Sequence, residues 1–298
     1  MSRAVVKSYA HAKINLSLEI LGKRPDGYHE IVSLMQALAL HDSLTFTAAE
    51  LLTLRSSAAE LEMGENLILR AARLLQAECR ISAGVMVELE KRIPVAAGLG
   101  GGSSDCAATL LALNELWGLG LSREHLIDLS LKLGSDVPYF FYGGTALVEG
   151  RGEKVTPLPP FPFHWVVLVT PRVSLPEKTK TLYGKITRDA YTSGDNTRRL
   201  AERVRRGEPV DVSEFSNAFL PVLLNESPAV RSCWERLHQA GAEHVLLSGS
   251  GPTLYVLLED ESDGRALCAL LMGLDAQVQL TTTANLEQPH EIYHTAVT

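Results

Sequence analysis

The stretch PVAAGLGGGSS, residues 94–104, decides how the rest of the sequence is interpreted. Four of its residues are glycines: Gly98, Gly100, Gly101 and Gly102. Glycine adopts positive φ and has no Cβ, so its backbone can come close to a ligand. Before the stretch, residues 85–89 alternate as a strand does; after it, residues 106–117 are typical of a helix. We therefore predict a loop that joins a strand to a helix.

Such a loop is suited to binding phosphate. The free N–H groups of a helix's first turn carry roughly half a positive charge, and Ser103 and Ser104 can cap the helix start or donate hydrogen bonds. No Lys-Ser or Lys-Thr follows the last glycine, which excludes a Walker A motif, and Ser103 replaces the third glycine of the dinucleotide fingerprint. An unused linker is a poor explanation, because so many glycines raise the entropy of the unfolded chain.

Composition limits the class of protein. The 298 residues suggest about two domains, and 46% hydrophobic with 21% charged residues is typical of a globular protein. The net charge of −7 argues against general nucleic-acid binding. We see no signal segment and no apolar run of membrane-spanning length. The four cysteines are far apart, which excludes a zinc knuckle and favours a reducing cytoplasm.

The remaining pattern mixes strands and helices without strict alternation, which favours an α+β fold over a doubly wound sheet. We predict strands at 12–21 (half-buried, with alternating polar and apolar residues), 31–40, 44–47, 85–89, 143–150, 165–170 and 277–281, and a strand, turn and strand at 245–258. We predict helices at 66–79, 106–117, 122–133, 196–206, 228–240 and 261–272, with Ser122 and Ser227 as N-caps. The residues GKRPDG, 22–27, predict a turn. The proline-rich segment KVTPLPPFPF, 154–163, is the best candidate domain boundary.

Three more blocks accompany the glycine-rich loop. They are AKINLSLEILGKRPDGYHE (12–30), LGSDVPYF (133–140) and SGSGPTLY (248–255). In this order the four blocks resemble the GHMP kinases, which act on galactose, homoserine, mevalonate and phosphomevalonate, and PDGYHE points to one branch of that family. The resemblance covers nearly the whole chain. It implies two α+β domains, 1–162 and 163–298, the first like ribosomal protein S5 domain 2 and the second an α/β sandwich, with the active site in the cleft between them.

The resemblance also implies a reaction. The γ-phosphoryl group of ATP, the co-substrate, would move to the 2-hydroxyl of a cytidylated methylerythritol in isoprenoid biosynthesis. Mg²⁺ would arrive with ATP, held mainly by phosphates and water. The expected partners are these small molecules, with no nucleic acid and no membrane, and the chain is expected to be a monomer or weak homodimer.

The catalytic residues implied are Lys13 and Asp136. Lys13 and Asn15 stand two positions apart on a strand, so their side chains project to the same side. A lysine on a strand is usually solvated, and Asp136 in its constrained corner would otherwise be a turn residue. The resemblance makes Asp136 the base that accepts the proton of the acceptor hydroxyl, with Lys13 facing the γ-phosphate or that carboxylate.

The implied binding residues fall into two sets. Substrate would meet Asn15, Tyr28, stacked on the cytosine, and His29, hydrogen-bonded to its edge. ATP would contact Pro94, Val95, Ala96, Ala97, Gly98, Leu99, Gly100, Gly101, Gly102, Ser103, Ser104, Asn66 and Lys91. Asn66 is equally suited to be a helix N-cap, and Lys91 to be an exposed lysine at a strand end. Gly249 and Gly251 would bring the third block to the cleft.

Two points stay open. The segment VSLPEKTKTLY, 173–183, is longer than the family pattern, so Ser174, Thr179 and Thr181 receive no role. Other functions also fit parts of the pattern: a GHMP kinase for mevalonate, homoserine or a sugar, or a non-catalytic ATP-binding module. The PDGYHE block and the Lys13–Asp136 pair argue against them.

Overall fold

The computed structural model describes residues 4–62, 66–173, 178–286 and 293–294. It contains two β-sheets. In the first, β11, β1, β2, β4 and β3 are neighbours in that order, while β5 pairs with both β2 and β6; the second has the order β10-β7-β9-β8. Within the described ranges, no helix is long and apolar enough to cross a membrane. The mixed α/β architecture with two sheets is the predicted α+β class.

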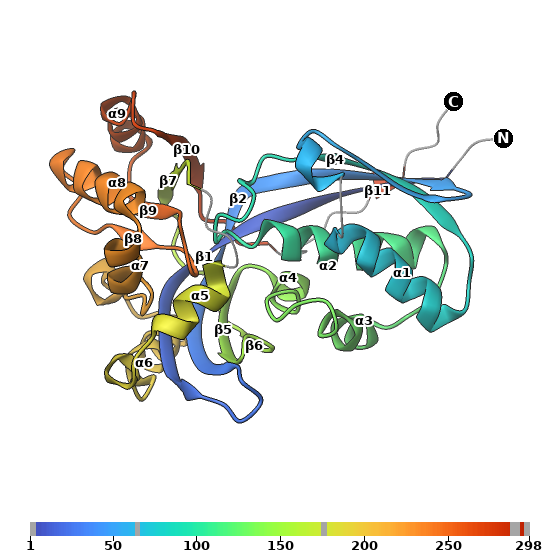
Figure 1. Ribbon diagram of the computed structural model, residues 1–298, viewed down its shortest axis with the longest axis horizontal. Helices are drawn as coiled ribbons and strands as arrows, with labels where there is room; N and C mark the ends of the chain where they lie inside the picture. Colours follow the sequence, from blue (N-terminus) through green and yellow to red (C-terminus); the bar gives the residue numbers. More distant parts are fainter. Residues whose placement is uncertain (1–3, 63–65, 174–177, 287–292, 295–298) are drawn as a thin grey trace.

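Two long strands dominate the first sheet. β1 (Val5–Lys23) and β2 (His29–Ala49) form an antiparallel hairpin that runs through both halves of the molecule (Figure 1). The predicted turn joins them: Gly27 has φ 88°, and Asp26 Oδ1 accepts the N–H of Tyr28 at 3.1 Å. The two strands predicted at 31–40 and 44–47 are one continuous strand, β2. The other members are β3 (Leu52–Ser56), β4 (Gly84–Glu90), β5 (Thr145–Gly150), β6 (Lys154–Pro157) and β11 (Tyr293–His294).

Three helices pack against the first sheet: α1 (Leu67–Cys79), α2 (Gly101–Leu116) and α4 (Tyr139–Tyr142), and α3 (Arg123–Ser130) packs on α2. A short 3-10 turn, η1 (Ala59–Leu61), precedes α1. One apolar core joins these helices to the sheet through residues such as Phe46, Leu75, Leu110 and Phe141. Asn66 caps α1 by accepting from Ile68 N, which is one of the two roles that the sequence left open for it, and the predicted N-cap Ser122 accepts from His125 N.

The second sheet consists of β7 (Trp165–Pro171), β8 (Leu246–Leu247), β9 (Leu254–Leu258) and β10 (Ala276–Thr282). Around it lie α5 (Lys178–Lys185), α6 (Asp195–Arg205), α7 (Leu220–Glu226), α8 (Pro228–Gln239) and α9 (Glu261–Leu270), with η2 (Arg188–Ala190) and η3 (Val212–Glu214) (Figure 1). Ser227 caps α8 as predicted. Helices α4, α5 and α7 and strands β3, β6 and β11 had no sequence prediction.

The prediction of a half-buried first strand is wrong. The polar residues of β1, Lys13, Asn15, Ser17 and Glu19, are at most 7% exposed, as buried as the apolar ones between them. The reason is that β1 lies inside the molecule: Ile14 and Leu16 contribute to the core shared with the second sheet, and α2 packs on β1 as well. The polar side chains of β1 are therefore held among protein groups, where each needs a partner.

The proline-rich segment connects the two sheets. Its first residues form β6 in the first sheet, and β7 of the second sheet begins at Trp165. After the last strand of the second sheet, the chain returns to the first sheet, where β11 pairs with β1. The division into 1–162 and 163–298 stays a prediction.

Candidate active site

Lys13 and Asp136 face each other, as the sequence predicted. Lys13 Nζ lies 4.0 Å from Asp136 Oδ2 and donates a hydrogen bond to Asn15 Oδ1 at 2.6 Å. The Lys13 side chain is 3% exposed, whereas that of Asp136 is 39% exposed. Burial lowers the pKa of Lys13, and the charge of Asp136 opposes this only in part. The pair thus consists of a desolvated ammonium and a carboxylate that a solute can reach.

Asp136 is held in place by its neighbours in sequence. It lies in the turn between α3 and α4, and the next residues, Val137, Tyr139 and Phe140, are buried in the first core. Tyr139 also donates a hydrogen bond from its hydroxyl to the carbonyl of Gly144 at 2.8 Å. Apolar anchors directly after Asp136 therefore fix the backbone while its carboxylate stays accessible.

The glycine-rich loop lies beside Lys13. Lys13 N donates to Leu99 O at 3.0 Å, and a Cβ on Gly100 would lie 3.0 Å from Lys13 Cγ. Three loop residues have positive φ: Ala96 (53°), Gly98 (84°) and Gly100 (73°). The loop thus follows a path that favours glycine, and it meets β1 at Lys13.

The helix after the loop begins earlier than predicted. α2 starts at Gly101 instead of residue 106, and Gly100 is its N-cap, so Ser103 and Ser104 lie in its first turn and are not caps. Glycine is a poor helix former, but packing requires it here: a Cβ on Gly101 would lie 2.8 Å from Lys91 Nζ. The free N–H groups of this helix therefore belong to the glycine-rich loop itself, which strengthens the case for phosphate binding.

The third block closes the same site. Ser248 Oγ donates to Gly98 O at 2.9 Å, and Thr253 N donates to Ala97 O at 3.2 Å. Gly249 N donates to Asn15 Oδ1 at 2.8 Å. The structure thus brings the β8–β9 loop to the glycine-rich loop and to β1, as the sequence predicted.

Lys91 is not an exposed strand-end lysine. Its ammonium donates to Asp42 Oδ2 and, at 3.0 Å, to Asp105 Oδ2, and all three side chains are buried. Burial lowers the pKa of Lys91, but Asp105 and Asp42 outweigh it and the net shift is upward. Asp42 also accepts the N–H groups of Arg92 and Ile93 through Oδ1, at 2.6 and 2.9 Å. The cluster ties the segment before the glycine-rich loop to β2 and α2.

Asp105 is the carboxylate of this cluster whose ionised form is disfavoured. Burial, with Asp42 nearby, raises the pKa of Asp105 to about 7, and Lys91 reduces the shift without cancelling it. Asp105 Oδ1 and Ser104 Oγ are buried and have no hydrogen-bond partner in the part of the chain that the structure describes. One cation thus faces two carboxylates, which favours a proton on one of them.

Asp105→Asn is expected to stabilise the protein in alkaline solution. The pKa of Asp105 is higher in the folded chain than its ordinary 3.8, so the free energy of unfolding falls as the pH rises from about 4 to about 7. The Asn variant lacks this loss, and its advantage over the parent should grow by about 2–3 kcal/mol between about pH 5 and 8.5. Urea unfolding at both pH values measures it, with exposed Asp128→Asn as the control. An equal difference at both pH values would contradict the assignment.

Tyr28 and His29 contact Arg151 and Tyr183. Tyr28 is half exposed, and the Arg151 guanidinium lies over its ring, 5.0 Å from the ring centroid. His29 stacks on Tyr183, with ring centroids 4.7 Å apart and an angle of 18°. Burial, with Lys23 adding to it, lowers the pKa of His29, so its imidazole is neutral near pH 7. The arrangement offers one open aromatic face beside a neutral hydrogen-bonding ring.

Sequence reasoning missed Tyr183, Arg151 and Ser248. Burial, and secondarily the charge of Asp136, raises the pKa of Tyr183. Arg151 precedes Gly152, where a Cβ would lie 3.4 Å from Asp136 Oδ1. The sequence signal that could have identified Tyr183 was its position at the end of the segment 173–183, to which no role was assigned. In that segment, Thr179 Oγ1 lies 3.0 Å from Ser250 Oγ of the third block, and Ser174 is outside the described residues.

The other predicted residues lie around the loop. Asn66 caps α1 and donates from Nδ2 to Leu61 O at 3.3 Å. Val95 is exposed, whereas Ala97 and Leu99 are buried under the loop. Contacts of these residues, and of Pro94 and Ala96, with ATP stay predictions.

This fold and the glycine-rich loop define a kinase site of the GHMP type, and both halves of the chain match that class. Residues 66–144 match the GHMP kinase N-terminal domain, and residues 200–270 match the C-terminal one. The fold is shared with homoserine kinase from Cytophaga hutchinsonii, at a TM-score of 0.73 and 18% identity over 97% of both chains.

Other relatives are nearer in sequence. 4-Diphosphocytidyl-2-C-methyl-D-erythritol kinase of Pelotomaculum thermopropionicum is 42% identical over 94% of this chain and 99% of its own, and that of Enterococcus faecalis is 39% identical over 92% and 97%. A crystal structure of 4-(cytidine 5'-diphospho)-2C-methyl-D-erythritol kinase is 31% identical, with a TM-score of 0.78 over 94% of this chain and 99% of that one. The chain therefore belongs to the GHMP kinase family, among the 4-diphosphocytidyl-2-C-methyl-D-erythritol kinases.

Proposed function

We propose that this protein transfers the γ-phosphoryl group of ATP to the 2-hydroxyl of 4-diphosphocytidyl-2-C-methyl-D-erythritol, giving ADP and the 2-phosphate, in isoprenoid biosynthesis. The observation that carries the proposal is the Lys13–Asp136 pair beside a glycine-rich helix start, in a chain 42% identical to such a kinase along nearly its whole length. The active site is the region where β1, the glycine-rich loop and the β8–β9 loop meet, between the proposed domains 1–162 and 163–298.

Phosphoryl transfer relies mainly on positioning and charge stabilisation. Asp136, accessible and 4.0 Å from Lys13 Nζ, takes the proton from the acceptor hydroxyl as the new P–O bond forms. The Lys13 ammonium, held by Asn15, keeps this carboxylate and the acceptor in place and offsets negative charge that develops on the transferred group. Lys13 and Asn15 cannot move freely, because both are buried in β1.

ATP would lie along the glycine-rich loop, with its phosphates at the N-terminus of α2. The positive-φ backbone at Gly98 and Gly100 turns the loop, and the first N–H groups of α2 are available to phosphate oxygens. The remaining nucleotide contacts that we propose come from Asn66 and from the accessible residues of 94–104. Lys91, buried between Asp42 and Asp105, would act by holding the segment before the loop.

Mg²⁺ fits this donor set. The hydroxyls of Ser103 and Ser104 lie in the first turn of α2, and Asp136 lies beside Lys13, so oxygen atoms, the ligands that this ion prefers, are present. Few protein ligands are needed when ATP phosphates and water supply the rest. When bound with ATP, the ion would neutralise charge on the phosphates.

The cytidine would occupy the region of Tyr28 and His29. The open face of Tyr28 can stack on the base, and neutral His29, held by Tyr183, can hydrogen-bond the base edge. Arg151, over the Tyr28 ring, supplies positive charge where the diphosphate leaves the base.

Tyr28→Ala is expected to raise KM for the cytidylated substrate by about 10- to 100-fold, because a stacked base contributes about 1–3 kcal/mol. KM for ATP should change little, since in the described chain the contacts of Tyr28 in the β1–β2 turn are with Asp26 and Arg151 and not with the glycine-rich loop. Initial rates with each substrate varied in turn measure both constants. An equal rise in the two KM values would argue against a cytidine site here.

The proposed function is tested by ADP release from MgATP with 4-diphosphocytidyl-2-C-methyl-D-erythritol, mevalonate, homoserine or galactose as acceptor. Turnover with the cytidylated alcohol alone, lost in Asp136→Asn, is the expected result. Turnover with another acceptor instead would keep the kinase class and overturn the substrate. ATP binding without turnover of any acceptor would support a non-catalytic module.

A further inference from the structure

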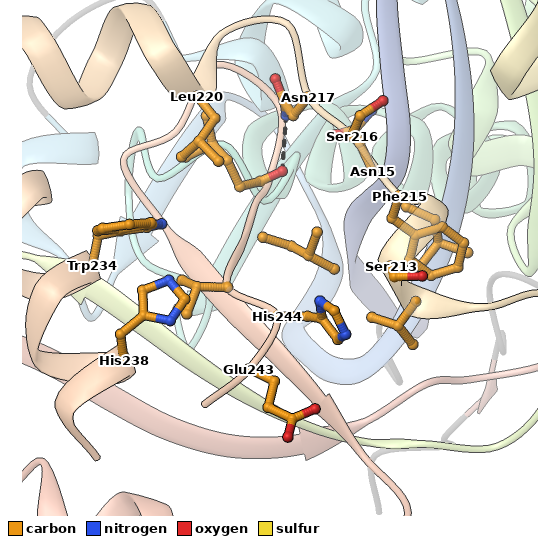
Figure 2. Close-up of a pocket in the computed structure, with 15 residues that line it drawn as sticks. Asn15, Ser213, Phe215, Ser216, Asn217, Leu220, Trp234, His238, Glu243 and His244 are labelled. Carbon is orange, nitrogen blue, oxygen red and sulfur yellow. Dashed lines mark hydrogen bonds between the residues drawn. The ribbon is translucent and has the colours of Figure 1, made fainter. Parts of the chain in front are cut away.

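Both ends of the Asn217 side-chain amide form hydrogen bonds with the backbone of neighbouring segments. Asn217 lies in the loop before α7 and is 8% exposed. Its Nδ2 donates to Leu247 O at 2.8 Å and to Gly249 O at 2.9 Å, while its Oδ1 accepts from Phe219 N at 2.9 Å. Figure 2 shows one of these bonds, from Asn217 toward the end of β8. Two donors and an acceptor in one plane suit an amide and no other uncharged side chain of that size.

The backbone around Asn217 is attached to β1. Leu18 N donates to Ser216 O at 2.8 Å, and Ala218 N donates to Leu18 O at 3.0 Å, so Asn217 pairs with Leu18 as a parallel bridge. The segment 216–218 therefore lies between β1 and the end of β8. Because it is held on β1, its amide has a fixed reference from which to orient the β8–β9 loop.

The loop that Asn217 holds reaches the catalytic lysine in two steps. The carbonyl of Gly249 accepts from Asn217 Nδ2 at 2.9 Å, and the N–H of Gly249 donates to Asn15 Oδ1 at 2.8 Å. The same Asn15 oxygen accepts from Lys13 Nζ at 2.6 Å. Gly249 has φ 56°, and a Cβ there would lie 3.2 Å from Lys13 Nζ, so this glycine packs directly on the ammonium.

We propose that Asn217 is a positioning residue for phosphoryl transfer. It fixes the carbonyl of Gly249, which aims the Gly249 N–H at Asn15, and Asn15 then holds the Lys13 ammonium toward Asp136. The proposal deepens the kinase function argued above and rests on it. No motif of the sequence pointed to Asn217, because its partners come from β8 and β1, far away along the chain.

The side chain of Asn217 also lines a cavity of about 250 Å³, together with Leu220, Trp234, His238 and His244 (Figure 2). Water in this cavity can reach the carbonyls of Leu247 and Gly249 once the amide is removed. A variant without the amide can therefore keep these carbonyls solvated and fold, while the geometry at Gly249 relaxes.

The test uses Asn217→Leu, which is nearly isosteric and uncharged, and Asn217→Ser as a smaller second variant that admits water. We expect kcat to fall about 10-fold or more, because small misplacements of catalytic groups are costly. KM for ATP and for the cytidylated alcohol should stay within about twofold, since Asn217 lies behind the site and contacts neither. Asn196→Asp is the control: Asn196 Nδ2 donates to Glu214 O in the same half of the chain, away from Lys13.

A second readout does not depend on activity. The side-chain ¹³Cε resonance of Lys13 reports its titration by NMR, with Lys13→Arg for assignment. Loosening Asn15 and Gly249 lets water reach the ammonium, so the titration midpoint should move up toward the ordinary lysine value in both Asn217 variants and stay unchanged in Asn196→Asp.

Unchanged kcat and an unchanged Lys13 titration in folded Asn217 variants would overturn the proposal. So would a loss of kcat that the Asn196 control shares. If the parent protein does not phosphorylate the cytidylated alcohol, the proposed function fails, and the Lys13 titration still decides whether Asn217 positions the lysine.

Discussion

Asp136→Asn is expected to lower kcat by about 100-fold or more, the lower range for loss of a general base. Asn cannot accept the proton of the acceptor hydroxyl, and it leaves the Lys13 ammonium without its charged neighbour at 4.0 Å. Lys13→Ala should cost at least as much, because it removes the ammonium that Asn15 holds and leaves a cavity beside β1.

Steady-state kinetics with saturating MgATP and the cytidylated alcohol measure both variants. Asp128→Asn, an exposed carboxylate on α3, is the matched control for Asp136 and should behave like the parent. Parent-like turnover in both Asp136→Asn and Lys13→Ala would disprove the assignment of the pair. Residual activity is expected, because phosphoryl transfer does not need strong proton abstraction early in the reaction.

Gly98→Ala is expected to have an effect of similar size for a different reason. Gly98 has φ 84°, and an added Cβ would lie 2.4 Å from Ser248 O and 2.6 Å from Gly251 O, both backbone atoms that cannot rotate away. The glycine-rich loop and the β8–β9 loop would have to separate. We expect kcat/KM for ATP to fall about 100-fold and the free energy of unfolding to drop by about 2–4 kcal/mol.

Gly102→Ala is the matched control for stability. Its Cβ would meet only Leu67 Cδ1, at 3.8 Å, and the residue is helical, so the variant should be as stable as the parent or up to about 1 kcal/mol more stable. Thermal unfolding of both variants, with ATP kinetics of Gly98→Ala, makes the comparison. If Gly98→Ala unfolds and binds ATP like the parent, the two loops do not meet as described.

Features that depend on residues close in sequence could be predicted. Asn66, Ser122 and Ser227 cap the helices they precede, because the bonded N–H lies two or three residues away. The turn before Tyr28 and the i, i+2 placement of Lys13 and Asn15 are equally local. The motif blocks, through their resemblance to a family, supplied what local patterns do not: the two-domain fold and the pairing of Lys13 with Asp136.

Features that depend on distant partners could not be predicted. The polar face of β1 looked solvated because alternation does not show what covers a strand. Lys91 was interpreted either as a nucleotide contact or as an exposed lysine, because its partner Asp42 lies on another strand and is not visible in the local sequence. The start of α2 was misplaced because glycine disfavours helix locally, whereas the close approach of Lys91 to Gly101 is a tertiary constraint that overrides propensity.

The length of β1 and β2 has a consequence for how the molecule comes apart. Leu18, Ile20 and Ile31 of these strands belong to the core around α7 and α8, while Val6 and Phe46 of the same strands belong to the core under α1 and α2. A fragment cut at the proline-rich segment would take both strands with one piece and expose the apolar side of the other. The two halves should therefore melt as one cooperative unit, and relative motion of the halves would have to bend a continuous hairpin rather than swing about a single flexible link.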